Sequence, residues 1–324
     1  MMKFLNKIVC LAIVAVSLFS CAQEKEESER SIHERILGAY VKEEYPNAKV
    51  LPSGLVVIET QEGTGKTLNN REAGYFEYTT RSLSNEVVET TDEQLAKEIG
   101  TFAHTNYYGP KMFETGYKST YKGLEEIMIG MKIGGKAKFI LPPWLSVIGN
   151  NGNRWEEANS LIYEIELKEV ISVIDTWEAD TMRRYAATHY PGLDTLSSHF
   201  YLKKLNNIQH KDTLESATLN VRYIGRLLDG WVFDTNIADT AKKYGIYDPE
   251  NDYNALEFKW NDDIETMEKD NSMVRGFCMA LKEMNYGDVA FTMFGSKYGY
   301  DYRGKSPIGP YQPLIFWLEV EPKE

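Results

Sequence analysis

Short stretches with large apolar residues at every other position recur along the chain. In the second half these stretches are 219–223, 289–293 and 314–320, and the first half repeats the pattern at 137–141 and 161–167. A period of two places the apolar side chains on one face of a strand, so each stretch predicts a β-strand with one buried face. Asp229-Gly230, which follows the stretch at 219–223, predicts a hairpin turn.

Helical spacing occurs at two places in each half. Helical stretches at about 31–43 and about 176–188 open the two halves. A shorter helix with one buried face is predicted by an i, i+4, i+7 spacing, in two residue sets: Leu124, Met128, Met131 and Phe277, Leu281, Met284. These short helices are expected to end at Gly134 and Gly287 in left-handed C-caps. Because the strands do not alternate with helices, the fold class is α+β: a curled antiparallel sheet wrapped around one short helix.

The chain after its first thirty residues is one unit written twice. Tyr40, Tyr45 and Pro46 recur 145 positions later as Tyr185, Tyr190 and Pro191. From Gly123 onward the shift becomes 153, with Gly134 matching Gly287 and Leu161-Ile162-Tyr163 matching Leu314-Ile315-Phe316. Sustained register with a single change of shift indicates a tandem duplication. The predicted domains are therefore 31–173 and 174–324.

The N-terminus has the pattern of a targeting signal. Residues 1–20 combine a basic start with an apolar run at 8–19, which is too short to span a bilayer. The run ends at Ser20-Cys21, which resembles a bacterial lipobox, so residues 1–20 are predicted to be a lipoprotein signal peptide. Residues 21–30 are polar and mostly acidic and predict a solvated tether. Acylated Cys21 would anchor the chain to a lipid bilayer of the bacterial cell envelope; the alternative is an ordinary secretory signal in which Cys21 is incidental.

Composition excludes several classes of function. The 324 residues carry 36 Lys and Arg against 48 Asp and Glu, for a formal charge of −12, which argues against a nucleic-acid partner. Three cysteines, one of them inside the apolar run, exclude a disulfide framework. Five scattered histidines show no metal-ligand spacing, so neither a metal nor a cofactor is expected.

A family resemblance rests on several ordered motifs. Residues 123–143 read GLEEIMIGMKIGGKAKFILPP, similar to the central stretch of FKBP-type peptidyl-prolyl cis–trans isomerases, G-W-E-E-a-L-x-x-M-x-x-G-x-K followed by a strand and a Pro. The second half resembles the family's V-H-Y-T-G, F-D-S-S and V-I-x-G-W motifs at 221–225, 231–235 and 273–277. Its closing run, a Tyr-Gly pair, I-P-P and L-V-F, is similar to 298–316. The resemblance implies two tandem FKBP-like domains. Each also carries an insertion that the usual domain lacks, and the longer one, at 236–272, is either a substrate-binding flap or padding.

The same resemblance implies a proline-binding pocket in the second domain. Phe277 would lie beneath the proline, and Asp234 and Tyr298 would be polar groups at the rim, with Tyr300 as an alternative to Tyr298. The walls would be Tyr223, Phe233, Val274, Ile308 and Phe316, and Leu256 or Phe258 would complete the floor. The first domain departs from this set, with Val88, Glu89, Tyr121, Leu124, Leu145 and Trp155 at the matching positions. We therefore expect the first domain to be inactive.

These inferences lead to two main hypotheses about function. The first is an envelope peptidyl-prolyl isomerase and folding helper whose clients are proline-containing polypeptides. The alternative is a non-catalytic FKBP-like lipoprotein that binds a protein partner. A third possibility, glycan capture by exposed aromatic residues, has no motif behind it; the residues concerned are Tyr107, Tyr108, Tyr247 and Tyr253.

Overall fold

The computed structural model describes residues 27–116, 120–146, 158–191, 193, 195–209, 214 and 217–322. The predicted signal peptide, Cys21 and the first part of the predicted tether lie outside these residues, as does Trp155. Within the described part of the chain, none of the helices has the length and apolar character needed to cross a bilayer.

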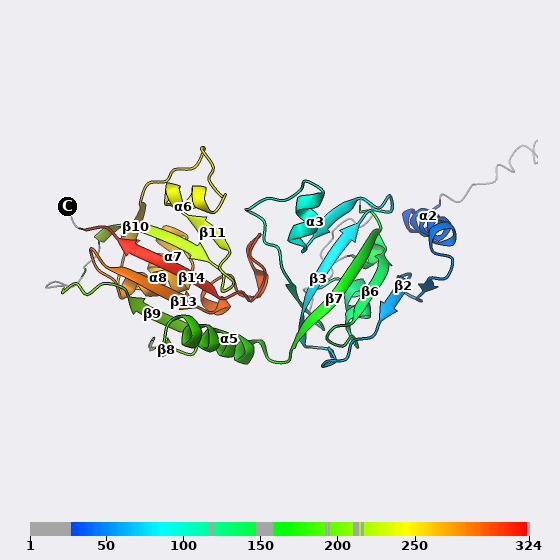
Figure 1. Cartoon of the computed structure of the whole chain (residues 1–324), viewed down its shortest axis with the longest axis horizontal. Helices are drawn as coiled ribbons and strands as arrows, with labels where there is room; N and C mark the ends of the chain where they lie inside the picture. The colour runs from blue at the N-terminus through cyan, green and yellow to red at the C-terminus, as the bar shows by residue number, and fades with distance from the viewer. Residues whose placement is uncertain are drawn as a thin grey trace, which may run out of the picture.

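The chain forms two units of the same architecture, which lie side by side in Figure 1. The first unit consists of α2 (Glu29–Glu44), β1 (Lys49–Val50), β2 (Val56–Gln61), β3 (Ala73–Arg81), β4 (Val87–Thr90), α3 (Glu93–Glu98), β5 (Lys111–Glu114), α4 (Lys122–Met128), β6 (Lys136–Leu141), the 3₁₀ turn η1 (Pro143–Leu145) and β7 (Leu161–Ile171). The predicted helix at 31–43 is confirmed as α2, whose N-cap Ser28 side chain accepts a hydrogen bond from the Ser31 N–H at 3.2 Å.

The second unit repeats this order of elements with one helix and one 3₁₀ turn added. It consists of α5 (Ile174–His189), β8 (Thr195–Ser197), β9 (Phe200–Lys204), β10 (Ala217–Arg226), β11 (Val232–Thr235), α6 (Ala238–Lys243), β12 (Leu256–Trp260), α7 (Ile264–Asn271), α8 (Arg275–Lys282), β13 (Val289–Phe294), the turns η3 (Ser296–Tyr298) and η4 (Asp301–Arg303), and β14 (Leu314–Val320). The added helix is α7. Asp229-Gly230 makes the predicted hairpin turn between β10 and β11, with Gly230 at φ 95°.

The topology of the two sheets bears out the duplication. The first sheet has the order β1-β2-β6-β7-β3-β4, with β5 also paired to β3. The second has β8-β9-β13-β14-β10-β11, with β12 also paired to β10, so every strand occupies the place of its counterpart. All of these pairings are antiparallel, which confirms the predicted α+β class.

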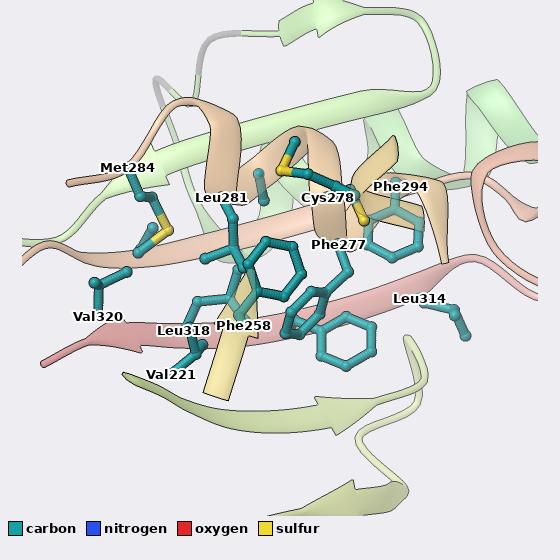
Figure 2. Close-up of a cluster of buried hydrophobic side chains, with 14 of the residues drawn as sticks. Val221, Phe258, Phe277, Cys278, Leu281, Met284, Phe294, Leu314, Leu318 and Val320 are labelled. Carbon is teal, nitrogen blue, oxygen red and sulfur yellow. The ribbon is translucent and has the colours of Figure 1, made fainter. Parts of the chain in front are cut away.

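Each sheet is covered by two helices, one on each face. On the inner face of the first sheet, α4 buries the side chains of Leu124 and Met128. On the inner face of the second sheet, α8 buries a larger set of side chains, including Phe277 and Leu281. Figure 2 shows the ring of Phe277 lying between α8 and the sheet, beside Phe258 of β12. On the outer faces, α2 and α5 cover separate apolar clusters. The core of each unit therefore lies between the sheet and its short helix.

The ends of the two short helices differ from the sequence prediction. Helix α4 ends at Met128 and α8 at Lys282, so the prediction that they run on to Gly134 and Gly287 is wrong. Both glycines do adopt left-handed conformations, at φ 81° and 80°, but in the turns that lead into β6 and β13. There their N–H groups donate to Leu167 and Val320 across the sheet, each at 2.8 Å, which requires the tight turn that glycine allows.

The two units contact one another through side chains near the end of the second. The Tyr311 hydroxyl donates to the Glu114 carboxylate at 3.0 Å, and the Gln312 amide donates to the Tyr75 hydroxyl at 3.0 Å. Tyr75 also packs against Trp177 of α5, with ring centroids 5.5 Å apart. These contacts hold β3 and β5 of the first unit against the segment that precedes β14 and against the start of α5.

Candidate functional site

Four aromatic rings from four different elements meet in the second unit. The rings of Phe277 and Phe316 have centroids 5.3 Å apart, and Phe233 lies 5.7 Å from Phe316, both pairs edge to face. Tyr223 completes the group at 5.9 Å from Phe277. We call these four residues the aromatic cluster. Edge-to-face packing at these separations is favourable beyond the burial of area, so the cluster is a stable apolar wall.

The four side chains of the aromatic cluster differ in how deeply they are buried. Phe277 and Phe316 are buried, with exposed fractions of 1% and 5%, whereas Tyr223 and Phe233 are half-buried. Of the other predicted wall residues, Ile308 is buried in the same core and Val274, the N-cap of α8, is half-buried against it. Phe258 is buried beside Phe277, at 6.1 Å, and Leu256 is half-buried on the same strand. The structure therefore gathers the predicted wall and floor residues.

A glycine makes room for two of the rings. Gly225 pairs with Asp234 of β11 on one side and with Phe316 of β14 on the other. A Cβ at this position would lie 2.6 Å from the Phe233 ring and 2.9 Å from the Phe316 ring, closer than real contacts allow. Gly225 belongs to the motif at 221–225, but sequence reasoning missed its role because no local pattern reports which rings cross a given backbone position.

The polar group of the cluster is a phenol bonded to a carboxylate. The Tyr223 hydroxyl donates to the exposed Asp234 carboxylate at 3.0 Å. Burial raises the pKa of Tyr223 above its ordinary value of 10, and the Asp234 charge raises it further. Tyr223 therefore remains a neutral hydrogen-bond donor throughout the physiological pH range.

Tyr298 and Tyr300, the two candidates for the second rim residue, both pack against the core of the second unit but have different neighbours. Tyr298 lies against Phe200, with centroids 6.5 Å apart, and lines a small cavity on the side of α8 that carries Met279. Tyr300 lies near Asp234: burial first, and then the Asp234 charge, raise its pKa. Of the two candidate tyrosines, Tyr300 is thus the one whose pKa responds to the Asp234 charge.

The turn that carries these tyrosines is held by a buried carboxylate. Glu178 of α5 is buried and accepts hydrogen bonds from the Ser296 N–H and, at 3.1 Å, from its hydroxyl. Burial raises the pKa of Glu178, and the bonds from Ser296 oppose that rise. The N-terminal helix of the second unit therefore fixes the start of the loop that leads to Tyr300.

The equivalent place in the first unit has different side chains. Thr80 has the register position of Gly225, since it pairs with Glu89 and Tyr163 where Gly225 pairs with Asp234 and Phe316. Val88, at the position of Phe233, is 59% exposed instead of forming a wall. The cavity that remains has a volume of about 10 Å³, about enough for one water, and is lined by Phe76, Tyr78, Phe113, Leu124, Met128, Tyr163 and Ile165.

An ion pair further distinguishes the first unit. The Tyr78 hydroxyl donates to Glu89 at 2.6 Å, as Tyr223 does to Asp234, but Lys111 also pairs with Glu89 at 2.7 Å. Lys111 occupies the register position of Leu256 and lies over the Tyr78 ring, 5.5 Å from its centroid. Burial opposes ionisation, but the bonds from Lys111 and Tyr78 nonetheless lower the pKa of Glu89. A charged side chain thus covers the place where the second unit has an apolar one.

Comparison with known proteins identifies the family of both units. A family model described as FKBP-type peptidyl-prolyl cis-trans isomerase matches residues 78–168 and 210–321, which together are well over half of the chain. The chain belongs to this FKBP family. The matched ranges fall one in each unit, which confirms the resemblance inferred from the motifs, and members of this family are peptidyl-prolyl isomerases.

Individual relatives of the FKBP family are distant from this chain. The chain is 26% identical over 133 residues to peptidyl-prolyl cis-trans isomerase FKBP16-1, chloroplastic, of Arabidopsis thaliana, an alignment covering 37% of this chain and 60% of that protein. Among solved structures, it is similar to the three FKBP domains of wheat FKBP73 at 16% identity and TM-score 0.29, covering 84% of this chain and 95% of that one. It is also similar to FkpA from Escherichia coli at 19% identity and TM-score 0.32, covering 52% and 72%.

Proposed function

We propose that this chain catalyses cis–trans isomerisation of X-Pro bonds in polypeptides at the aromatic cluster of the second unit. The observation that carries the proposal is the meeting of Tyr223, Phe233, Phe277 and Phe316 around one hydrogen-bonded carboxylate. Membership of the FKBP family supports it, since the family's members are isomerases of this type.

The chemistry suits such a surface. Rotation about an X-Pro bond has a barrier of about 18–20 kcal/mol because amide resonance favours the planar forms, and no covalent bond is made or broken. A proline ring seated against Tyr223 and Phe233 would lose the water that stabilises the polar, planar amide. Binding the twisted form better than either planar form then lowers the barrier. Such a mechanism requires neither a nucleophile nor proton transfer.

The test is turnover of a proline peptide by the full chain. With the chain at about one hundredth of the peptide concentration, NMR exchange between the cis and trans signals should be much faster than the uncatalysed exchange, which takes tens to hundreds of seconds. The rate should be nearly constant between about pH 6 and 8, because burial raises the pKa values of Tyr223 and Tyr300 and keeps both phenols neutral.

Two outcomes would contradict this proposal. Binding of the peptide without faster exchange would favour the alternative, a non-catalytic protein-binding member of the family. A bell-shaped pH–rate profile would indicate that an acid and a base take part in the reaction.

We propose in addition that the mature chain is a lipoprotein of the bacterial cell envelope, attached through Cys21. The support is the short apolar run that stops at Ser20-Cys21. In cells fed a fatty acid that carries a detectable tag, the wild-type chain should incorporate the tag and Cys21→Ser should not. Cys10→Ser, which changes the other N-terminal cysteine, is the matched control and should remain labelled. Label retained in Cys21→Ser would contradict the proposed anchor.

A further inference from the structure

A loop of the first unit reaches the second unit beside the aromatic cluster. The loop, residues 102–109, follows α3, and Figure 1 shows this part of the first unit extending toward the second. Tyr107 packs edge to face on Trp231 at 5.4 Å, and the Trp231 indole N–H donates to the His104 carbonyl at 3.2 Å. Burial raises the pKa of the Tyr107 phenol, and the charge of Asp229 raises it further. Tyr107 thus makes a specific contact across the two units.

This contact continues the surface of the cluster. Trp231 lies 6.4 Å from Phe233, which belongs to the cluster, so Tyr107, Trp231 and Phe233 form one aromatic row. All three residues are half-buried, and their rings remain partly accessible. The path from Tyr107 through Trp231 to Phe233 consists of two centroid distances, 5.4 and 6.4 Å. An extended polypeptide spans this path with about three to four residues. A polypeptide whose proline lies at the cluster can therefore reach Tyr107 with a flanking residue.

Comparison with the second unit indicates that Tyr107 is not needed to fold its own loop. In the first unit Phe102 stacks on Tyr108 at 5.4 Å, and in the second unit Tyr247 and Tyr253, at the matching positions, stack at 5.0 Å. The stacked pair is thus a shared feature of both insertions. Tyr107 matches Asp252, which accepts a hydrogen bond from the Asn254 N–H of its own loop. The aromatic side chain at 107 is specific to the first unit and is directed to the second.

Other contacts already join the two units. The bonds of Tyr311 to Glu114 and of Gln312 to Tyr75 involve different strands and do not depend on Tyr107. Loss of the Tyr107 ring therefore leaves two of the described hydrogen bonds between the units in place. A role limited to holding the units together does not explain why the ring lies in line with the cluster.

We propose that Tyr107 of the first unit is a specificity-determining residue of the second unit's site. It contacts an apolar or aromatic side chain about three residues from the proline of the client polypeptide, with Trp231 bridging to Phe233. This inference rests on the proposed function, because the client is the same proline-containing chain. The first unit then contributes directly to the substrate choice of the second.

The test compares matched peptides on the full-length chain. Each peptide has the same X-Pro core, with either Phe or Ser three residues before or three residues after the proline. At one of these two peptide positions, the wild-type chain should prefer Phe over Ser. The Phe peptide should have about fivefold higher kcat/KM and about fivefold lower Kd, which is the effect of one aromatic contact. Tyr107→Ala should abolish this preference, and Tyr107→Phe should keep it because the ring remains.

The control is Tyr40→Ala, which removes the same side chain from a half-buried place on α2, at the end of the first unit remote from the second. Tyr40→Ala should keep the preference for Phe. The inference is overturned if the wild type shows no preference, if Tyr107→Ala retains it, or if Tyr40→Ala loses it equally. Failure of catalysis is separable: if peptides bind without faster exchange, isomerisation is excluded and the ratio of Kd values still decides the role of Tyr107. Absence of both binding and turnover overturns both proposals.

Discussion

Replacing Phe277 with alanine is expected to lower kcat/KM for an X-Pro peptide by about a hundredfold, equivalent to about 2.7 kcal/mol of transition-state stabilisation. Phe277 is the most buried member of the cluster, and its ring centroid lies 5.3 to 6.1 Å from those of Tyr223, Phe316 and Phe258. Removal of this ring therefore lets the whole surface collapse or admit water. The measurement is exchange NMR on the full-length variant. Since removing a buried Phe also costs about 3–5 kcal/mol of stability, thermal melting must accompany it.

Two further variants separate catalysis from folding. Phe277→Leu copies the residue found at the matching position of the first unit, preserves most of the volume, and should lower kcat/KM by about tenfold. Leu124→Ala makes a cavity at that matching position in the first unit and should destabilise the protein without changing kcat/KM. Equal losses of activity in folded Leu124→Ala and Phe277→Leu would mean that the second unit's cluster has no special role.

Converting the second site to resemble the first should abolish catalysis by the whole chain. Tyr121 stands in the first unit where the second has Val274, and it lies close enough to add to the effect of burial in raising the pKa of Tyr163. In the double variant Val274→Tyr/Phe277→Leu the rate at a fixed peptide concentration should fall to about 1% of wild type or less, because the first unit's cavity of about 10 Å³ admits no proline ring.

The reverse substitution provides the control for this conversion. Tyr121→Val in the first unit should leave the rate unchanged, since Lys111 and Thr80 still close the site there. A folded double variant that retained a substantial share of the wild-type rate would show that the first unit is itself catalytic, contrary to the proposed division of labour.

Much of the fold follows from local pattern. Alternation at 219–223 and 314–320 predicts β10 and β14 because the alternating apolar residues, such as Leu219, Val221 and Leu318, are buried in the core that includes α8. The helical stretches that open the two units are confirmed as α2 and α5, each longer than predicted by a few residues. The duplication is also readable, since both units retain the same order of strands and the register between them survives in sequence.

The site was predictable only where residues lie on regular elements. Tyr223, Phe233, Phe277 and Phe316 all come from strands or from α8, and the structure brings all four together. Tyr298 ends the 3₁₀ turn η3 and Tyr300 is the N-cap of the next turn, η4, and this irregular backbone gives no period from which to derive the direction of a side chain. Sequence pattern therefore does not choose between them.

Contacts between distant segments left no local signal at all. Thr80 and Gly225 occupy the same register position, but what distinguishes them is the Phe233 ring that crosses only the glycine. Sequence pattern does not distinguish Tyr107 from the other tyrosines of the loops, because its partner Trp231 lies more than a hundred positions away in the chain. A sequence pattern predicts the periodicity of a single helix or strand, but it does not predict which helices, strands and loops contact one another.

The central claim, that proline is bound at the second unit's aromatic cluster and not at the first unit's equivalent, is tested most directly by mapping a bound peptide on the wild-type chain. In side-chain NMR spectra of aromatic-labelled protein, titration with an X-Pro peptide should shift the ring signals of Tyr223, Phe233 and Phe316 in a saturable manner. The ring signals of Tyr78, Phe113 and Tyr163 in the first unit should remain unchanged. Saturable shifts confined to the first unit, or absent from the second unit's cluster while the peptide is bound, would contradict this account.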